Sequence, residues 1–169
     1  LLIFAKSPVP GQVKTRLIPG IGRRRAATIY QDLLTRTLNT ARRADFSAIQ
    51  VGVDGKIRHR YFTHLKNRHN VKLYSQRGTD LGQRMFNAFN SALDRYPFAV
   101  LTGSDCPSLS SSDLMLASKC LENKADVVLG PAYDGGYYLI GLRMNIPRLF
   151  LDIEWGKETV LAETCTRIN

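Results

Sequence analysis

Cysteine is scarce in this sequence, and nothing in it indicates a small protein held together by covalent or metal links. The three cysteines, Cys106, Cys120 and Cys165, are an odd number and form no C-x-x-C pair. That pattern argues against a disulfide framework and against a zinc knuckle, so we expect buried free thiols. With 169 residues, of which 44% are hydrophobic, the chain is long enough to bury a core without such links. We expect a single domain over residues 1–169.

Long apolar segments are also missing. The longest apolar runs, Leu1–Ala5 and Tyr137–Leu142, are far short of the ~20 residues that a helix needs to cross a bilayer. The first run has no basic residues ahead of it and no further apolar sequence behind it, so it does not look like a secretory signal. We therefore expect no membrane span and a reducing, cytoplasmic setting.

Acidic residues are sparse in the first half of the chain. Residues 1–84 contain 17 Lys and Arg but 4 Asp and Glu, whereas residues 85–169 contain 7 and 10. The net charge of +10 and the pI near 9.9 would suit nucleic-acid binding, because phosphates attract any basic face. No RRM, KH or helix-turn-helix pattern accompanies the charge, and the aromatic residues are not arranged as a stacking surface. A nucleic-acid-binding module is therefore a remote alternative.

Short apolar runs alternate with amphipathic segments, which is typical of an α/β fold. Capping patterns at Asp80 with Gln83 and at Ser110 with Asp113 precede two of the helices, and a glycine turn at 134–136 separates the last two strands. Alternation without earlier hairpin spacing predicts a mostly parallel sheet covered on both faces, with ligands beyond the carboxyl ends of the strands. The expected strands are 1–5, 48–53, 71–75, 98–102, 126–130 and 137–142, and the expected helices lie at about 26–41, 56–67, 81–93, 110–123 and 158–167.

The loop after the first expected strand carries three cations and a flexible glycine. It contains Lys6, Gly11, Lys14 and Arg16, with Thr15 between two of the cations. Lysine offers a compact charge and arginine a planar fork that matches phosphate oxygens, while loop amides near a helix entry add dipoles of the right sign. The loop is not a P-loop, and its cations could simply be solvated. Its place directly after a strand favours a phosphate site.

A carboxylate follows the fourth expected strand, in the turn Gly103-Ser104-Asp105-Cys106-Pro107. Magnesium and manganese usually take one or two carboxylates and complete their shell with water and substrate phosphates. Asp105 is therefore a candidate metal ligand. A side chain that only caps the turn would fit the same sequence.

Further candidates follow the later strands. Asp134 lies in a glycine turn and Glu154 precedes Trp155, and carboxylates opposite a basic loop suit metal-assisted phosphate chemistry. Gly78 and Gly82 flank a helix start, which allows a ribose or a base to approach closely. The structural alternatives are a hairpin turn for Asp134, a core position for Trp155, and a helix cap for Asp80, which lies between the two glycines.

Five motifs occur in one order along nearly the whole chain. They are Phe4-Ala5-Lys6-x-Pro8-x-Pro10-Gly11-x-Val13-Lys14-Thr15-Arg16-Leu17, Thr79-Asp80-Leu81-Gly82-x-Arg84-Met85, Gly103-Ser104-Asp105-Cys106-Pro107, Gly130-Pro131-Ala132-x-Asp134-Gly135-Gly136-Tyr137 and Glu154-Trp155-Gly156. Together they resemble the DUF2064 family, which is glycosyltransferase-A-like and belongs to the nucleotide-diphospho-sugar transferase superfamily. The resemblance implies a three-layer α/β/α Rossmann-like GT-A fold. Its sheet would have about seven mostly parallel strands, with the strand before the last antiparallel.

The resemblance also implies a chemistry. Lys14-Thr15-Arg16 is similar to the phosphate-binding segment of the superfamily's nucleotidyltransferases, including the phospholactate guanylyltransferases, and Asp105 matches the acidic metal ligand after strand four. Mg²⁺ or Mn²⁺, a nucleotide or nucleotide-sugar donor and an unidentified small-molecule acceptor are implied. Glycosyltransferases of this fold usually carry Asp-x-Asp, whereas Asp105 is followed by Cys106-Pro107. That turn is more similar to nucleotidyltransferases and molybdopterin-guanine transferases.

These patterns predict a metal-dependent transferase with a nucleotide-activated donor. Sugar transfer is the main hypothesis, nucleotidyl transfer the alternative, and a non-catalytic nucleotide sensor a third. His59, His64 and His69 are expected at the surface, outside the site. The residues expected to act are Lys6, Gly11, Lys14, Thr15, Arg16, Gly78, Asp80 and Gly82 for the nucleotide, Asp105 and Asp134 for the metal, and Asp134 and Glu154 for catalysis.

Overall fold

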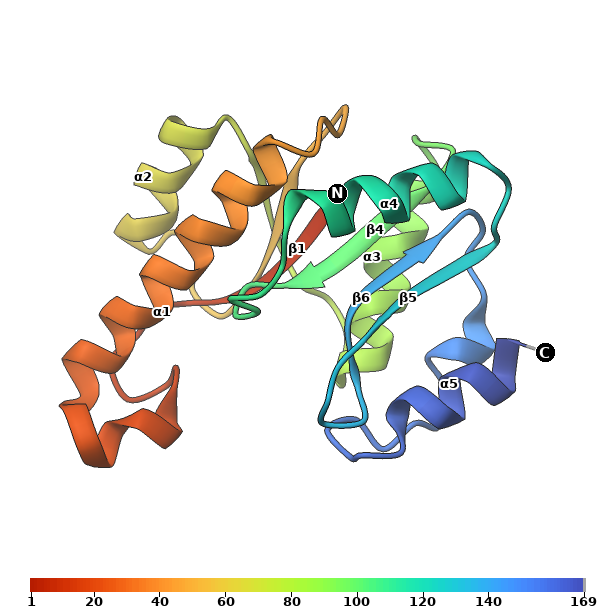
Figure 1. The fold of residues 1–169 in the computed structure, drawn as a ribbon. Helices are drawn as coiled ribbons and strands as arrows, with labels where there is room; N and C mark the ends of the chain where they lie inside the picture. Colours follow the sequence, from red (N-terminus) through yellow and green to blue (C-terminus); the bar gives the residue numbers. More distant parts are fainter. Residues whose placement is uncertain (169) are drawn as a thin grey trace. The chain divides into compact units, whose positions relative to one another are not determined.

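The computed structural model describes residues 1–168 and shows an α/β fold (Figure 1). Its strands form one six-stranded sheet in the order β3-β2-β1-β4-β6-β5. β2 and β3 are parallel, whereas β6 is antiparallel to both of its neighbours. The predicted fold class is confirmed, with six strands in this part of the chain rather than about seven. The strands are β1 (Leu2–Lys6), β2 (Gln50–Asp54), β3 (Lys72–Ser75), β4 (Ala99–Gly103), β5 (Val127–Pro131) and β6 (Tyr137–Leu142).

Most helices begin and end close to their predicted bounds. They are α1 (Ile18–Arg42), α2 (Arg60–His69), α3 (Leu81–Leu93), α4 (Ser111–Glu122) and α5 (Val160–Ile168), with short 3₁₀ helices η1 (Thr15–Leu17) and η2 (Pro147–Leu149). α1 begins earlier than predicted and is kinked at Gly22, whose φ of 80° and ψ of 160° are not helical. No helix within residues 1–168 is both long and apolar enough to cross a membrane.

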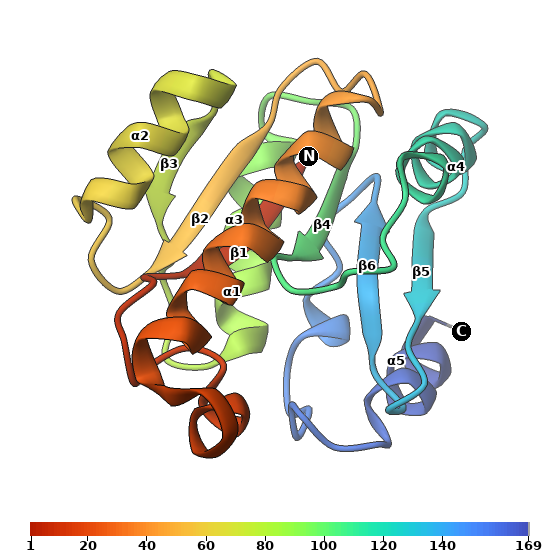
Figure 2. The same cartoon turned by 60° about the vertical axis from the view of Figure 1, so that its left-hand side comes forward.

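The chain divides into two compact units, and the first consists of residues 1, 3–75 and 103–111. In this unit α1 and α2 lie side by side over the strands β1 to β3 (Figure 2). The Tyr61 hydroxyl of α2 donates a hydrogen bond to the Gln31 carbonyl of α1, at 2.8 Å, and so connects the two helices. The largest fully buried side chains here are Ile3, Leu34, Leu38, Val51, Phe62 and Leu65.

The second unit consists of residues 2, 76–102 and the chain from 112 onward. Its strands β5 and β6 form the predicted hairpin, with a register shift at Gly130 and Pro131. Phe150 stacks on Phe89 of α3 with ring centroids 5.8 Å apart, which places aromatic packing at the centre of this unit. Its largest fully buried side chains are Phe89, Leu114, Leu121, Ile140, Leu142 and Leu149.

Two expectations about burial are wrong. The cysteines are free thiols as predicted, but Cys106 and Cys120 are only half-buried and Cys165 is exposed. His69 is not a surface residue, because only 6% of it is exposed where α2 ends against the first unit's core. His59 has a structural role as the N-cap of α2, since its Nδ1 accepts a hydrogen bond from a backbone N–H.

His69 should make the stability of the protein depend on pH. Burial lowers the pKa of His69 from its ordinary value of 6.5, and the nearby charges of Arg42, Arg68 and His64 lower it further. The folded state therefore prefers the neutral imidazole. The contribution of His69 to the free energy of unfolding is complete above the pKa that His69 has in the unfolded chain, and it is lost as the pH falls below that value. We expect the urea midpoint to drop between about pH 7.5 and about pH 5.5, and to drop less in His69→Gln.

His64→Gln is the matched control, because His64 lies on the same helix and is exposed. It should keep most of the pH dependence, because it leaves the buried imidazole of His69 in place and removes only one of the three charges that lower the pKa of His69. An equal pH dependence in His69→Gln would show that His69 is not the group responsible.

Candidate functional site

The β1–α1 loop, residues 7–17, is fixed by its own backbone and by β2. Ser7 N–H donates to the Asp54 carbonyl at 2.9 Å, and Val9 N–H donates to the Ser7 carbonyl at 2.7 Å. Gly11 has a φ of 93° and Lys14 a φ of 47°, so the loop turns twice through the left-handed region. That conformation costs a non-glycine residue about 1 kcal/mol, so the surrounding structure must hold Lys14 in place.

Lys14 and Asp105 come together from loops that are far apart in the sequence. Lys14 Nζ lies 3.1 Å from Asp105 Oδ2, and the two side chains are 24% and 57% exposed. An ion pair this open to solvent contributes at most about 1 kcal/mol to stability. The pair can therefore separate at little cost in free energy. The Lys14 ammonium would then bind a phosphate oxygen, and the Asp105 carboxylate would bind a divalent cation.

Tyr30 of α1 connects the same two loops from inside the core. Its hydroxyl accepts a hydrogen bond from Lys6 N–H at 2.6 Å and lies 2.8 Å from Ser104 Oγ. Burial raises the pKa of Tyr30, its hydrogen bonds to Ser104 and Lys6 oppose that rise, and the negative charges of Asp105 and Asp54 add to it. Tyr30 is therefore a neutral phenol that holds the end of β1 against the turn after β4.

Tyr30, Ser104 and Asp54 contribute to this site but were not among the residues expected there. Tyr30 lies within the helix expected at 26–41, and a buried tyrosine hydroxyl needs a polar partner, which was a usable signal. Asp54 ends β2 just as Asp105 follows β4, so its position at a strand end was a signal that could have been used.

Removing the Tyr30 hydroxyl should destabilise the loop anchor. Tyr30→Phe leaves the Lys6 N–H and the Ser104 hydroxyl without this partner in a buried place, and we expect a loss of about 2 kcal/mol in unfolding free energy. Tyr74→Phe is the matched control, because within residues 1–168 the buried Tyr74 hydroxyl has no hydrogen-bond partner. Urea unfolding of both variants measures the difference, and equal losses would rule out the anchor.

The other predicted residues of the first unit stay predictions. Lys6, Thr15 and Arg16 are exposed, Lys6 at the end of β1 and the other two in η1. The structure thus places Lys6 as the last residue of the strand, and Thr15 and Arg16 in the loop that follows it. It does not test whether they bind a phosphate.

Asp80 and Gly82 each have a local structural role at the start of α3. Asp80 Oδ1 accepts a hydrogen bond from Gln83 N–H at 2.8 Å, which makes Asp80 the predicted helix cap. Gly82 is buried, and a Cβ there would overlap the Phe150 carbonyl oxygen. Gly78 has a φ of 138°, a conformation that favours glycine. These roles need no ligand, so nucleotide binding by the three predicted residues stays untested.

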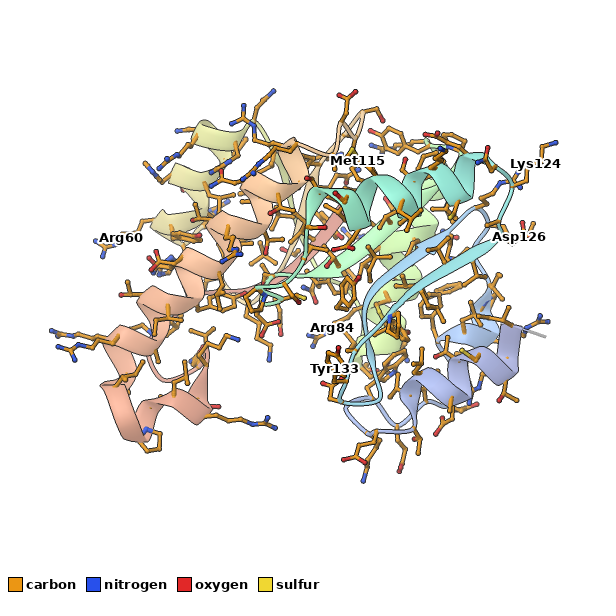
Figure 3. The ribbon with its side chains drawn as sticks, in the orientation of Figure 1. Arg60, Arg84, Met115, Lys124, Asp126 and Tyr133 are labelled. Atoms are coloured by element: carbon orange, nitrogen blue, oxygen red, sulfur yellow. The ribbon has the colours of Figure 1, made fainter. Side chains whose placement is uncertain are left out.

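The β5–β6 hairpin presents Asp134 at its tip. Asp134 Oδ1 accepts a hydrogen bond from Gly136 N–H at 3.2 Å, so one carboxylate oxygen shapes the turn. The side chain is exposed, and its Oδ2 is not used in that bond. Leu161 N–H donates to the Gly135 carbonyl at 2.8 Å, which fixes the turn against α5. Figure 3 shows the exposed Tyr133 at the same tip.

Glu154 and Trp155 occupy a turn of the second unit. Glu154 is exposed, whereas Trp155 is half-buried and lies edge-on to Tyr137 with ring centroids 6.4 Å apart. Burial raises the pKa of Tyr137 to about 12. Trp155 thus takes a packing position, in agreement with the structural alternative given for it above.

Asp105 fits a divalent cation that also needs ligands from a substrate. Its carboxylate is an exposed hard oxygen donor, and the lysine beside it can bind the phosphates that would complete the coordination. Nowhere in residues 1–168 are three His, Cys, Asp or Glu side chains grouped to hold a metal. A Mg²⁺ or Mn²⁺ bound together with a nucleotide therefore fits this donor set better than a permanently bound structural metal.

Comparisons with known proteins agree with this architecture. A structure from Desulfovibrio desulfuricans, provisionally described as a nucleotide-diphospho-sugar transferase, is 33% identical with a TM-score of 0.87, and the match covers 99% of this chain and 73% of that one. Two others share only the fold. A nucleotidyl transferase from Methanothermobacter thermautotrophicus is 12% identical, with a TM-score of 0.64 and coverage of 96% and 79%. CMP:2-keto-3-deoxy-manno-octonic acid synthetase, complexed with CTP, is 10% identical, with a TM-score of 0.52 and coverage of 99% and 83%.

A search of the curated proteins found no match to the sequence. The family assignment rests on two other findings, which agree. Residues 37–157 match the model of the family described as "Uncharacterized protein conserved in bacteria (DUF2064)", and this range includes Asp105, Asp134 and Glu154. Together with the relative at 33% identity, this match establishes that the chain is a member of the DUF2064 family.

Proposed function

We propose that this protein is a metal-dependent transferase whose donor is a nucleotide-diphospho-sugar. The observation that carries the proposal is the solvent-accessible ion pair of Lys14 and Asp105 at the ends of β1 and β4. A site at the carboxyl ends of strands is where α/β sheets bind nucleotides. The description of the relative from Desulfovibrio desulfuricans supports the same class of donor.

In the proposed reaction, cations of the β1–α1 loop bind the donor phosphates. The Lys14 ammonium leaves Asp105 and binds a phosphate oxygen. Lys6, at the end of β1, and Arg16 add positive charge nearby in the sequence. These cations stabilise the negative charge that develops on the leaving phosphate during direct displacement. Asp105 would hold the Mg²⁺ or Mn²⁺, which when bound would supply further charge neutralisation.

The acceptor is an unidentified small molecule. Asp134 is proposed to orient it, because the carboxylate is exposed at a hairpin tip and has one oxygen outside the turn hydrogen bond. Glu154 is the second acid proposed for this role and is also exposed. An ionised carboxylate can accept a hydrogen bond from an acceptor hydroxyl and align its oxygen for attack.

Nucleotidyl transfer is the second candidate, and one observation favours it. Asp105 is followed by Cys106 and Pro107, so the turn has a single carboxylate where sugar transferases of this fold usually have two. The Cys106 side chain beside it lies 3.3 Å from the Ser108 hydroxyl. A triphosphate donor, which brings more phosphate oxygens, would complete a metal shell with fewer protein ligands.

A thermal-stability screen tests the proposal and separates the candidates. Nucleoside triphosphates and nucleotide-diphospho-sugars are each added with and without Mg²⁺ or Mn²⁺, because a ligand at 100 times its Kd stabilises by about 2.7 kcal/mol. We expect a metal-dependent shift with a nucleotide-sugar. A shift with a triphosphate alone would favour nucleotidyl transfer, and no shift with any nucleotide would contradict both.

The loop assignment has its own matched variants. Lys14→Ala should weaken binding of the stabilising nucleotide about tenfold, because it removes one charge-assisted hydrogen bond to phosphate. Lys119→Ala removes an exposed lysine from α4 and should leave binding unchanged. Equal affinities of the two variants would show that the nucleotide does not use the β1–α1 loop.

A further inference from the structure

A recess of the first unit shares Pro8 and Pro10 with the β1–α1 loop but does not include the Lys14–Asp105 pair. It has a volume of about 550 Å³ and is bounded by α1, by the start of α2 and by Pro8 and Pro10 of the β1–α1 loop. Its size is within the range of small-molecule pockets. Lys14, Arg16 and Asp105 are not among the residues that line this recess, which we name the α1–α2 pocket.

The α1–α2 pocket is cationic. Arg24 of α1 and Arg60 and His64 of α2 line it, and no acidic residue is among its lining residues in the described part of the chain. Figure 3 shows Arg60 extending outward from the start of α2. Residues 55–79 contain seven Lys and Arg and three His but no Asp or Glu. Like charges gathered in this way repel one another, and an anionic ligand would relieve that repulsion.

The two helices that form the pocket are held together independently of any ligand. The Tyr61 hydroxyl donates to the Gln31 carbonyl at 2.8 Å and lies 3.1 Å from Thr35 Oγ1. Both Tyr61 and Gln31 are lining residues. The wall is thus pre-formed, which lowers the entropic cost of binding.

The neutral polar groups of the lining suit hydroxyls. His59 Nδ1 accepts the Tyr61 N–H, so Nε2 is the ring nitrogen that remains to donate to a ligand oxygen. Thr28 Oγ1 donates to the Arg24 carbonyl, which leaves its oxygen free to accept. The side-chain amide of Gln31 offers both a donor and acceptors.

We propose that the α1–α2 pocket binds a small phosphate monoester that carries hydroxyl groups, with the size of a pentose or hexose phosphate. The guanidinium groups of Arg24 and Arg60 bind the phosphate, since their planar donors match its oxygens. Thr28, Gln31 and His59 serve the hydroxyls. The inference goes beyond the proposed transferase activity and does not depend on it.

Isothermal titration calorimetry with ribose 5-phosphate tests the pocket, with ribose and inorganic phosphate as separate probes. We expect ribose 5-phosphate to bind, inorganic phosphate to bind more weakly and ribose not to bind. Arg60→Gln and Arg24→Gln should each weaken ribose 5-phosphate about tenfold. Arg36→Gln removes the same charge from an exposed position of α1 outside the pocket and should have no effect.

Lys14→Gln separates this pocket from the β1–α1 loop and should leave ribose 5-phosphate binding intact. Loss of binding in Lys14→Gln with full binding in Arg24→Gln and Arg60→Gln would overturn the proposal, because the ester would then occupy the nucleotide site. An affinity that falls equally in Arg36→Gln would also overturn it. A third result would overturn it as well: no binding of ribose 5-phosphate together with salt-dependent binding of single-stranded DNA. The surface would then bind a polyanion.

Discussion

Asp105→Asn is expected to abolish metal-dependent nucleotide binding, with a loss of affinity of about a hundredfold or more when Mg²⁺ is present. The amide keeps the shape of the side chain but removes the charge that a divalent cation needs. The folded structure should survive, because the ion pair with Lys14 is exposed and contributes little to stability. Nucleotide titrations with and without Mg²⁺ measure the effect.

Asp126→Asn provides the matched control. Asp126 also forms an exposed ion pair, with Arg143 at 3.7 Å, but it does not follow β4. We expect its nucleotide affinity and its response to Mg²⁺ to equal those of the unsubstituted protein. An Asp105→Asn variant that still responds to Mg²⁺ would move the metal ligand to another carboxylate.

Gly135→Ala is expected to lower the unfolding free energy by about 3 kcal/mol and to displace Asp134 with it. Gly135 has a φ of 79°, and a Cβ at this position would overlap the carbonyl oxygen of Glu158. The methyl group meets backbone rather than a flexible side chain, so the hairpin must separate from the residues before α5. Urea unfolding measures the loss.

Two other glycines separate the causes of this loss. Gly156 has a φ of 88° but open space around its Cβ position, so Gly156→Ala reports the conformational strain alone. Gly20 has neither a positive φ nor a neighbour within 4 Å, so Gly20→Ala should be nearly neutral. A Gly135→Ala loss no larger than that of Gly156→Ala would show that contact with Glu158 does not matter.

The sequence predicted the elements because their signals are local. The capping pattern of Asp80 with Gln83 placed the start of α3, and the glycine turn after Asp134 placed the β5–β6 hairpin, each within a few residues. The strand ends then placed Lys14 and Asp105 among the candidates, and the structure brings these two side chains into contact. Local chemistry was sufficient for all of this.

Contacts between distant residues could not be read in the same way. The sequence predicted a helix around Tyr30, but it did not show that the Tyr30 hydroxyl meets Ser104, which is 74 residues further along the chain. The burial of His69 likewise depends on how α2 packs, because the polar sequence around it looks like a solvated helix. The α1–α2 pocket exists only once two helices and a loop are assembled.

The kink at Gly22 divides α1 mechanically. Its non-helical φ and ψ interrupt the hydrogen-bonded rod, so the turn before it need not follow the direction of the longer part behind it. That longer part carries Tyr30, which is tied to β1 and to Ser104. The kink thus lies between the segment that carries Lys14 and the anchored remainder of the helix. The direction of that segment is therefore set by the hydrogen bonds of the β1–α1 loop and not by the axis of the longer part of α1.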